Sequence, residues 1–333
     1  MCGIAGYFGK GAEKKVKEAL KLMNHRGRDF TGISKVKDGV IGHNLHATVG
    51  FLPQPLIDGD FWFVGNLEAY NWRELAEKYR IEARNDAELV FNLLMKKGDK
   101  ALKMIDGPFA LAFSDGSKII LARDKFGVFP LFFSMSPFAF ASERKALPNL
   151  MELNPRHRIV VEDGQIIDIY EPIVYKVKEI SEDKAIEQLD RLVRKALEKR
   201  AHESMSLLFS GGLDSSILAF YLRELGFDFK AICVGLRGSS DIERAKKVAD
   251  ILNLDICVVE VPRGKVLKAV ETISRAIESS DPVKVEAALV SYFASLKSNT
   301  KVVISGLGAD ELFGGYARMH RDMELETFWA LKN

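Results

Sequence analysis

The chain contains Ser206-Leu207-Leu208-Phe209-Ser210-Gly211-Gly212-Leu213-Asp214-Ser215-Ser216, which runs from an apolar stretch through a glycine turn into a helical pattern. The apolar part predicts a buried strand over 206–209, and the apolar spacing predicts a helix over 214–225. Small residues allow the turn to close around an anion, and the unpaired N–H groups at the start of the helix point toward it. The stretch therefore predicts a phosphate-binding loop.

This loop is not a Walker A loop, because no Gly-Lys-Ser/Thr follows at the required spacing. It resembles the PP-loop, the pyrophosphate-binding loop of enzymes that cleave ATP between the α and β phosphates. The alternative is an ordinary glycine-rich turn, which the Asp-Ser-Ser ending disfavours. The resemblance implies that ATP contacts Ser210, Gly211, Gly212, Asp214, Ser215 and Ser216.

Strands and helices alternate regularly on both sides of this loop. Apolar runs over 206–209, 230–234, 256–261 and 301–305 predict strands, and helical spacing predicts helices over 185–201, 214–225, 242–252, 265–278 and 285–296. Such alternation predicts an α/β fold with a doubly wound parallel sheet.

A second loop, 305–316, follows the last predicted strand. Ligands in open α/β sheets bind beyond the carboxyl ends of the strands, so we expect both loops at one site. Mg²⁺ prefers one or two carboxylates together with phosphate oxygens, and we predict that Asp214 and Asp310 hold it. The alternative for Asp310-Glu311 is a solvated acidic turn.

The first half of the chain has a different pattern. Short apolar runs separated by turn residues predict strands over 4–8, 61–65, 109–113, 118–122, 131–133, 138–141 and 158–161, with helices over 12–24 and 86–97. This order is typical of α+β layers. We therefore predict two domains, 1–172 and 180–333, with a hinge over 170–182.

Cys2 follows the initiator methionine. Removal of Met1 places a thiol and a free α-amine on one residue, and an amine with a pKa near 8 takes the thiol proton at neutral pH. This is the nucleophile-and-base arrangement of N-terminal nucleophile hydrolases. The alternative is an ordinary residue at a frayed chain end.

Composition limits the possible functions. The 333 residues are 47% hydrophobic and 28% charged, with net charge +2, and show no basic patch for nucleic acid. There is no signal-peptide pattern, and no apolar run approaches the roughly 18 residues of a membrane span. The three cysteines form no even-numbered disulfide framework, so we predict a cytoplasmic protein. Cys233 and Cys257 lie in apolar runs and are expected to be buried.

Six further motifs recur in an order typical of one family: Cys2-Gly3-Ile4-Ala5-Gly6, His25-Arg26-Gly27-Arg28-Asp29, Asn66-Leu67-Glu68-Ala69-Tyr70-Asn71, Asn85-Asp86-Ala87-Glu88, Ala122-Arg123-Asp124-Lys125-Phe126-Gly127 and Ser142-Glu143-Arg144-Lys145-Ala146-Leu147. With the two loops, they make nearly the whole chain resemble glutamine-dependent asparagine synthetase. The resemblance implies an N-terminal nucleophile hydrolase domain of stacked antiparallel sheets that releases ammonia from glutamine. It also implies a PP-loop domain that forms a β-aspartyl adenylate with ATP and Mg²⁺, and an internal tunnel for ammonia.

The same resemblance implies the roles of individual residues. Cys2 is the nucleophile, Asn66 and the backbone of Leu67 stabilise the oxyanion, and Glu68 and Asp86 hold the α-amine of glutamine. The positions around adenine and ribose are Leu208, Val234, Ser305 and Gly306.

The chain departs from the family at several positions. Leu67 replaces a glycine, and an arginine that clamps the glutamine carboxylate is replaced near His46. Leu307 replaces a glutamate associated with adenylate formation, and Val283-Lys284-Val285-Glu286 replaces the acceptor-binding segment. Family members are typically longer and carry a catalytic lysine beyond this chain's last residue. The cations of this chain that could replace that lysine are Lys284, Arg318 and Arg321.

We therefore expect a cytoplasmic, glutamine-hydrolysing ligase that makes asparagine, AMP and pyrophosphate from aspartate and ATP, without nucleic-acid or membrane partners. Two alternatives are open: an amidotransferase for another carboxylate, and a non-catalytic or partner-completed protein. A homo-oligomer is expected, because a missing helical layer leaves apolar surface for a second subunit to cover.

Overall fold

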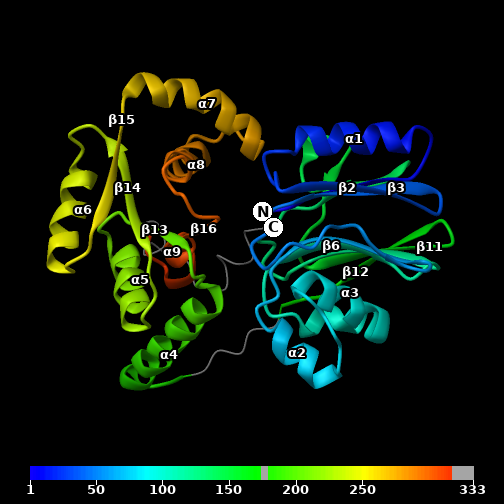
Figure 1. Ribbon diagram of the computed structural model, residues 1–333, viewed down its shortest axis with the longest axis horizontal. Coiled ribbons are helices and arrows are strands. Elements are labelled where there is room, and N and C mark those ends of the chain that lie inside the picture. Colours follow the sequence, from blue (N-terminus) through cyan, green and yellow to red (C-terminus); the bar gives the residue numbers. More distant parts are fainter. Residues whose placement is uncertain (174–178, 317–333) are drawn as a thin grey trace. The chain divides into compact units, whose positions relative to one another are not determined.

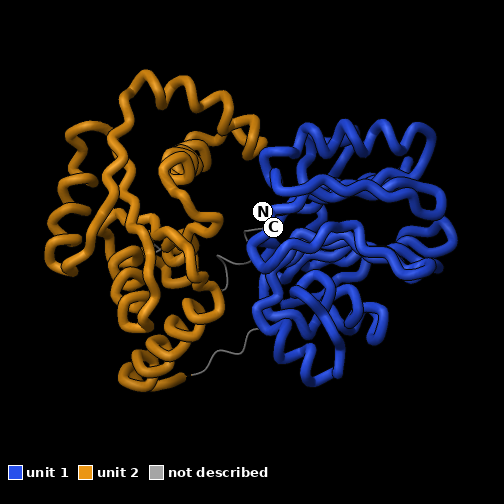
Figure 2. Tube along the Cα trace, in the orientation of Figure 1, with its two compact units in different colours: residues 1–178 blue, residues 179–333 orange. Residues whose placement is uncertain are grey.

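The computed structural model describes residues 1–173 and 179–316. The chain divides into two compact units, residues 1–178 and 179–333 (Figure 2). Each unit has its own sheets and its own buried core.

Unit 1 is built on two six-stranded antiparallel sheets. The first has the order β10-β8-β9-β1-β3-β2, and the second has the order β12-β11-β7-β6-β5-β4. The strands of the first are β1 (Gly3–Tyr7), β2 (Phe30–Val36), β3 (Gly39–Leu45), β8 (Phe132–Met135), β9 (Phe138–Ala141) and β10 (Met151–Glu152). Those of the second are β4 (Leu56–Asp58), β5 (Phe61–Leu67), β6 (Phe109–Ser114), β7 (Lys118–Arg123), β11 (His157–Glu162) and β12 (Gln165–Tyr170).

The two sheets stack face to face, and helices cover their outer faces (Figure 1). Side chains alternate along each strand. On β5, Trp62 and Val64 enter the core between the sheets, whereas Phe63 packs toward the helices of the second sheet. Helix α1 (Ala12–Leu22) covers the first sheet, and α2 (Trp72–Tyr79) and α3 (Asp86–Lys97) cover the second. Two short 3₁₀ helices, η1 (Gly98–Met104) and η2 (Arg144–Ala146), complete the unit. The prediction of stacked antiparallel sheets between helices is confirmed.

Strands β2 and β3 did not follow from the apolar pattern, because glycines interrupt it. A Cβ at Gly32 would lie 2.0 Å from the carbonyl oxygen of Gln54, and one at Gly42 would lie 2.6 Å from Cδ1 of Leu20. The first contact is with backbone and is too close for any side chain, so glycine is required at position 32. The second would require the buried Leu20 side chain to shift. Both glycines weaken the sequence signal of a strand.

Unit 2 contains one parallel sheet with the strand order β15-β14-β13-β16. The chain moves outward from β13 to β15 and then returns to the other side of β13, so the winding reverses between β13 and β16. The strands are β13 (Met205–Leu208), β14 (Lys230–Leu236), β15 (Ile256–Val261) and β16 (Val302–Ile304). The helices are α4 (Glu182–Arg200), α5 (Leu213–Glu224), α6 (Ser240–Ile251), α7 (Arg263–Ile277), α8 (Pro282–Ser295) and α9 (Ala309–Phe313).

Helices pack on both faces of this sheet (Figure 1). One apolar core joins α4, α5 and α6 to the sheet, and a second joins α7 and α8 to β14 and β15. The predicted doubly wound parallel sheet is confirmed.

The two cysteines of unit 2 differ in burial. Cys233 on β14 is 2% exposed, as predicted, but Cys257 is only partly buried. The expectation for Cys257 was wrong, because β15 is an edge strand with neighbours on one side only. Among the described residues, no helix has the length and apolarity that crossing a membrane requires.

Candidate active sites

The first site forms around Cys2, where the two sheets of unit 1 meet. The backbone nitrogen of Cys2 donates to Oδ1 of Asn66 over 2.9 Å. Cys2 directly precedes β1 of the first sheet, whereas Asn66 lies near the end of β5 in the second. The structure thus brings together two predicted residues that are 64 positions apart in sequence.

The side-chain amide of Asn66 has an unused donor. Asn66 is 2% exposed, its Oδ1 accepts from Cys2, and its Nδ2 has no hydrogen-bond partner among the described residues. A buried donor without a partner costs about 1–3 kcal/mol. Such a cost at this position points to a ligand oxygen as the partner of Nδ2.

The thiol of Cys2 lies against the backbone of His46. The His46 N–H donates to Cys2 Sγ over 3.3 Å. Burial raises the pKa of the Cys2 thiol, and this backbone hydrogen bond opposes the rise. A buried, less acidic thiol needs a base beside it, and removal of Met1 would turn the Cys2 nitrogen into an α-amine able to accept the thiol proton.

Two carboxylates lie near each other beside this cysteine. Asp86 accepts hydrogen bonds from the N–H groups of Ala69 (3.1 Å) and Ala87 (2.9 Å). Burial raises the pKa of Asp86 to about 6, and the neighbouring charge of Glu68 adds to the rise. A cation between the two groups would remove this repulsion, so the pair suits an ammonium group.

An ionic cluster around Arg26 and Glu143 also contacts the backbone of Cys2. Arg26 donates through Nε to the carbonyl oxygen of Cys2 (2.9 Å) and through Nη1 to Oε1 of Glu143 (3.1 Å). His25 and Lys145 also contact Glu143, at 2.9 and 2.8 Å. Burial acts to raise the pKa of Glu143, but hydrogen bonds from His25 and Lys145 and the charge of Arg26 outweigh it and hold the pKa at about 2. These residues lie in two of the motifs quoted above, 25–29 and 142–147, for which the sequence indicated no role.

This cluster leads to a stability prediction. Glu143→Ala leaves the buried guanidinium of Arg26 uncompensated and should lower the free energy of unfolding of unit 1 by about 3–5 kcal/mol, measured by urea denaturation at pH 7. The ionised form of Glu143 is favoured by folding, so its contribution is present above about pH 4.5 and is lost as the pH falls toward 2. Glu18→Ala is the control, because its pair with Lys14 is exposed on α1. Equal effects of the two variants would contradict the prediction.

The second site lies in unit 2, at the carboxyl ends of β13, β14 and β16. Gly211 has φ +68°, and a Cβ there would lie 2.8 Å from Cα of Ala245 on α6. A Cβ at Gly306 would lie 2.8 Å from Cβ of Asp214. The two predicted loops therefore pack against each other, and glycine is required at both contacts.

These loops line a cavity of about 370 Å³. Nine of the predicted nucleotide and metal residues line it: Leu208, Ser210, Gly212, Asp214, Ser215, Val234, Ser305, Gly306 and Asp310. The other two predicted residues of the loop do not. Gly211 packs against α6, and Ser216 donates its hydroxyl proton to the carbonyl oxygen of Gly212 over 2.7 Å.

Asp214 and Asp310 lie close enough to interact. Burial raises the pKa of Asp214, and the charge of Asp310 raises it further. Mg²⁺ commonly takes one or two carboxylates and completes its shell with water and phosphate oxygens, so this pair fits the ion. No group of three or more His, Cys, Asp and Glu residues suited to a metal occurs in residues 1–173 and 179–316.

The residues that depart from the family pattern lie in different surroundings. Leu67 is not among the residues with positive φ, so leucine occupies this position without backbone strain. Leu307 is 70% exposed and lines the cavity, whereas Lys284 does not line it. Arg318 and Arg321 lie outside the described residues.

Arg244, on α6, lines the same cavity and did not emerge from the sequence analysis. Its position soon after a predicted strand at the phosphate-binding edge of the sheet was the available signal.

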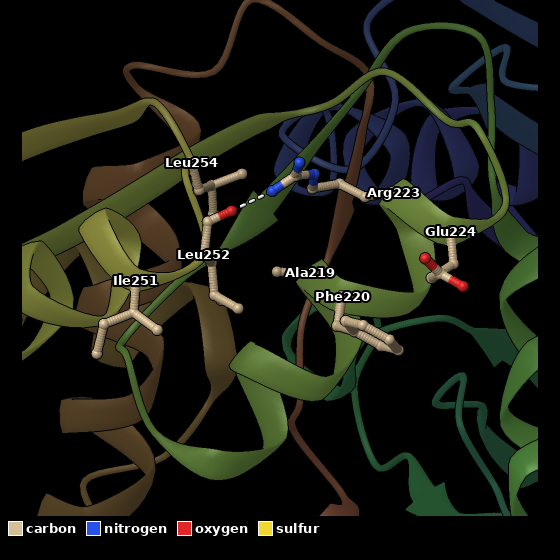
Figure 3. A pocket seen from close by; sticks show the side chains of 7 residues that line it. All are labelled: Ala219, Phe220, Arg223, Glu224, Ile251, Leu252 and Leu254. Carbon is tan, nitrogen blue, oxygen red and sulfur yellow. Dashed lines mark hydrogen bonds between the residues drawn. The ribbon is translucent and has the colours of Figure 1, made fainter.

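A second cavity of about 310 Å³ lies where α5 and α6 end and includes Arg223 (Figure 3). It contains none of the predicted site residues.

Comparisons with known proteins match each half of the chain to a known family. Residues 1–187 match the family model of the glutamine amidotransferase domain, and residues 184–332 match the model named asparagine synthase. A Methanocaldococcus jannaschii protein with the name of a glutamine-hydrolysing asparagine synthetase is 33% identical, over 96% of this chain and 70% of that protein. Asparagine synthetase 2 of Arabidopsis thaliana is 29% identical, over 98% of this chain and 63% of that protein. The chain therefore spans about two thirds of the length of these relatives.

Proposed function

The chain belongs to the family of glutamine-hydrolysing asparagine synthetases, and on this premise we propose that it is an ATP-dependent amidotransferase that makes asparagine. Residues 1–172 are the proposed glutaminase domain, and residues 180–333 are the proposed PP-loop synthetase domain. The main support for the glutaminase activity is the buried side-chain amide of Asn66. Its Oδ1 accepts a hydrogen bond from the Cys2 nitrogen, and its Nδ2 is left to donate to a ligand.

Glutamine hydrolysis starts at Cys2 in this proposal. The α-amine takes the thiol proton, Sγ attacks the side-chain amide carbon, and the oxyanion accepts hydrogen bonds from Asn66 Nδ2 and the N–H of Leu67. The C–N bond then breaks, the proton held by the amine goes to the leaving nitrogen, and ammonia departs. Water hydrolyses the resulting thioester to glutamate and regenerates the thiol. Glu68 and Asp86 hold the α-amine of glutamine, which the raised pKa of Asp86 supports.

The cavity of unit 2 is the proposed ATP site. Leu208, Val234, Ser305 and Gly306 contact adenine and ribose, and Ser210, Gly212, Asp214 and Ser215 form the phosphate end of the cavity. Gly211 and Ser216 belong to the same proposed loop but do not line the cavity. A carboxylate oxygen of the acceptor attacks the α-phosphorus, and the bond to the bridging oxygen breaks to release pyrophosphate. Ammonia then displaces AMP from the acyl carbon and forms the amide. Mg²⁺, held by Asp214 and Asp310, would neutralise negative charge on the phosphates.

A pyrophosphate-exchange assay tests the synthetase half. With Mg²⁺ and aspartate, labelled pyrophosphate should enter ATP, and removal of the metal ion should reduce exchange to background. Asp310→Asn should lower exchange by at least about tenfold, because it removes a charged ligand. Asp228→Asn is the matched control, since Asp228 is exposed and does not line the cavity. If ATP binds but no carboxylate supports exchange, the synthetase proposal is wrong and a non-catalytic protein is favoured.

The apolar part of the same cavity favours a second candidate for the carboxylate substrate that receives the ammonia. Ala287, Val290 and Leu307 line it, and side chains of this kind suit a less polar carboxylate than aspartate. The exchange assay should therefore include short aliphatic carboxylates. A higher exchange rate with one of them than with aspartate would favour that acceptor.

We also propose that the protein is a cytoplasmic homo-oligomer. Its three cysteines are free thiols, which suits a reducing compartment. Large apolar side chains are exposed on unit 2, including Leu213 (76%), Ile251 (81%) and Leu267 (75%). Light scattering of the purified protein measures the oligomeric state, and a monomer at micromolar concentration would contradict this proposal.

A further inference from the structure

We propose that Arg244 binds the phosphates of the nucleotide and supplies positive charge during adenylation. This inference rests on the proposed ATP-dependent function. Arg244 lies near the start of α6, at the carboxyl edge of the sheet where the phosphate-binding loop begins.

The first support is the position of the guanidinium beside that loop. Its Nε donates to the carbonyl oxygen of Ser210, the first loop residue, over 3.4 Å. The backbone of α6 also packs on the loop, because a Cβ at Gly211 would lie 2.8 Å from Cα of Ala245 and 3.0 Å from the carbonyl oxygen of Arg244. The loop and the arginine are therefore held together by close backbone packing as well as by a hydrogen bond.

The second support is the set of donors that Arg244 leaves available. Nη2 donates to Oδ1 of Asp241 over 2.7 Å, whereas Nη1 makes no hydrogen bond within the described part of the chain. About half of the side chain is exposed. A planar guanidinium with free donors at a cavity wall suits the oxygens of a phosphate, which arginine binds through two parallel hydrogen bonds.

The third support is the charge of the cavity. Its described lining carries four carboxylates, those of Asp214, Asp241, Asp310 and Glu311, and Arg244 is the only lysine or arginine within it. A triphosphate brings several further negative charges into the same space. One metal ion at the Asp214–Asp310 pair leaves much of this repulsion in place, so a cation close to the loop is needed for tight binding.

A purely structural role is the competing explanation, because Arg244 also links Asp241 to the loop. Arg244→Gln separates the two roles. The glutamine amide can still donate to the loop carbonyl, but its positive charge is lost. Arg244→Lys keeps the charge and loses the planar pair of donors, so it should have an intermediate effect.

The experiment is isothermal titration calorimetry of the full chain with MgATP and, separately, with adenosine. We expect Arg244→Gln to raise the Kd for MgATP by about tenfold or more and to change the Kd for adenosine by less than about twofold. Equal weakening of both ligands, or an unchanged Kd for MgATP, would overturn the role of Arg244.

Arg223→Gln is the matched control. Arg223 donates to the backbone carbonyls of Leu252 and Asn253 at the other cavity, where α5 and α6 end (Figure 3). Its replacement should leave the Kd for MgATP unchanged, and an effect equal to that of Arg244→Gln would overturn a site-specific role. A wild-type protein that binds no MgATP would contradict the proposed function itself. Binding by the wild type with no change in Arg244→Gln contradicts only this inference.

Discussion

Cys2→Ala should abolish glutamine-dependent amide synthesis and should leave synthesis from added ammonia intact. Loss of a nucleophile from a site in which nucleophile and base act together costs on the order of 10⁴-fold or more in rate. The residues that line the ATP cavity all belong to unit 2, so the substitution changes none of them. The measurement is amide formation with glutamine and with ammonium chloride, under the same conditions and with the same acceptor.

Cys257→Ala is the control for this variant. Cys257 is a partly exposed free thiol on the edge strand β15 of unit 2, whereas Cys2 belongs to unit 1, and Cys257 does not line the ATP cavity. Its replacement should leave glutamine turnover unchanged. Unchanged glutamine turnover in Cys2→Ala, or an intact mass showing that Met1 is retained in active protein, would rule out the proposed nucleophile.

Asn66→Ala should lower kcat for glutamine hydrolysis by about 100- to 1000-fold, the usual cost of one lost oxyanion donor. The variant loses the Oδ1 that accepts from the Cys2 nitrogen and the unpartnered Nδ2 that is proposed to donate to the oxyanion. An effect on the transition state lowers kcat and kcat/KM together, with little change in KM. Steady-state glutamate release at several glutamine concentrations measures both constants.

Asn44→Ala controls for the loss of a buried asparagine. Asn44 is fully buried in the first sheet, and its Nδ2 donates to the carbonyl oxygen of Leu20 over 2.8 Å. This variant should lower stability but should leave kcat of the folded protein within a few-fold of wild type. A similar fall in kcat for both variants would show that Asn66 acts through folding rather than on the oxyanion.

The sequence predicted the parts of the fold in which apolar residues recur at a regular helix or strand spacing. The strand-loop-helix stretch at Ser206–Ser216 and the parallel sheet of unit 2 follow from alternating apolar runs. The strands with Gly32 and Gly42 did not, since close contacts with distant residues decide those positions and leave no periodic signal. Burial of Cys257 was overestimated for a related reason, because an apolar run does not reveal whether its strand is central or at an edge.

The sequence predicted those site residues that lie in recognisable motifs. The structure brings four of them together in pairs, Cys2 with Asn66 and Asp214 with Gly306. Arg244 and the contacts of Arg26 with Cys2 and Glu143 were missed. An arginine in a helix is usually a solvated surface residue, and only the position of α6 against the loop distinguishes Arg244 from the others.

The contact between Cys2 and Asn66 has a consequence for newly made protein. One partner enters from the first sheet and the other from the second, so neither half of the sandwich contains a complete site. A nascent or partly folded chain therefore carries a cysteine with no oxyanion donor beside it, and it should not consume cellular glutamine. The proposed glutamine hydrolysis should therefore begin only after the two sheets of unit 1 have docked, so the onset of this activity would report that docking.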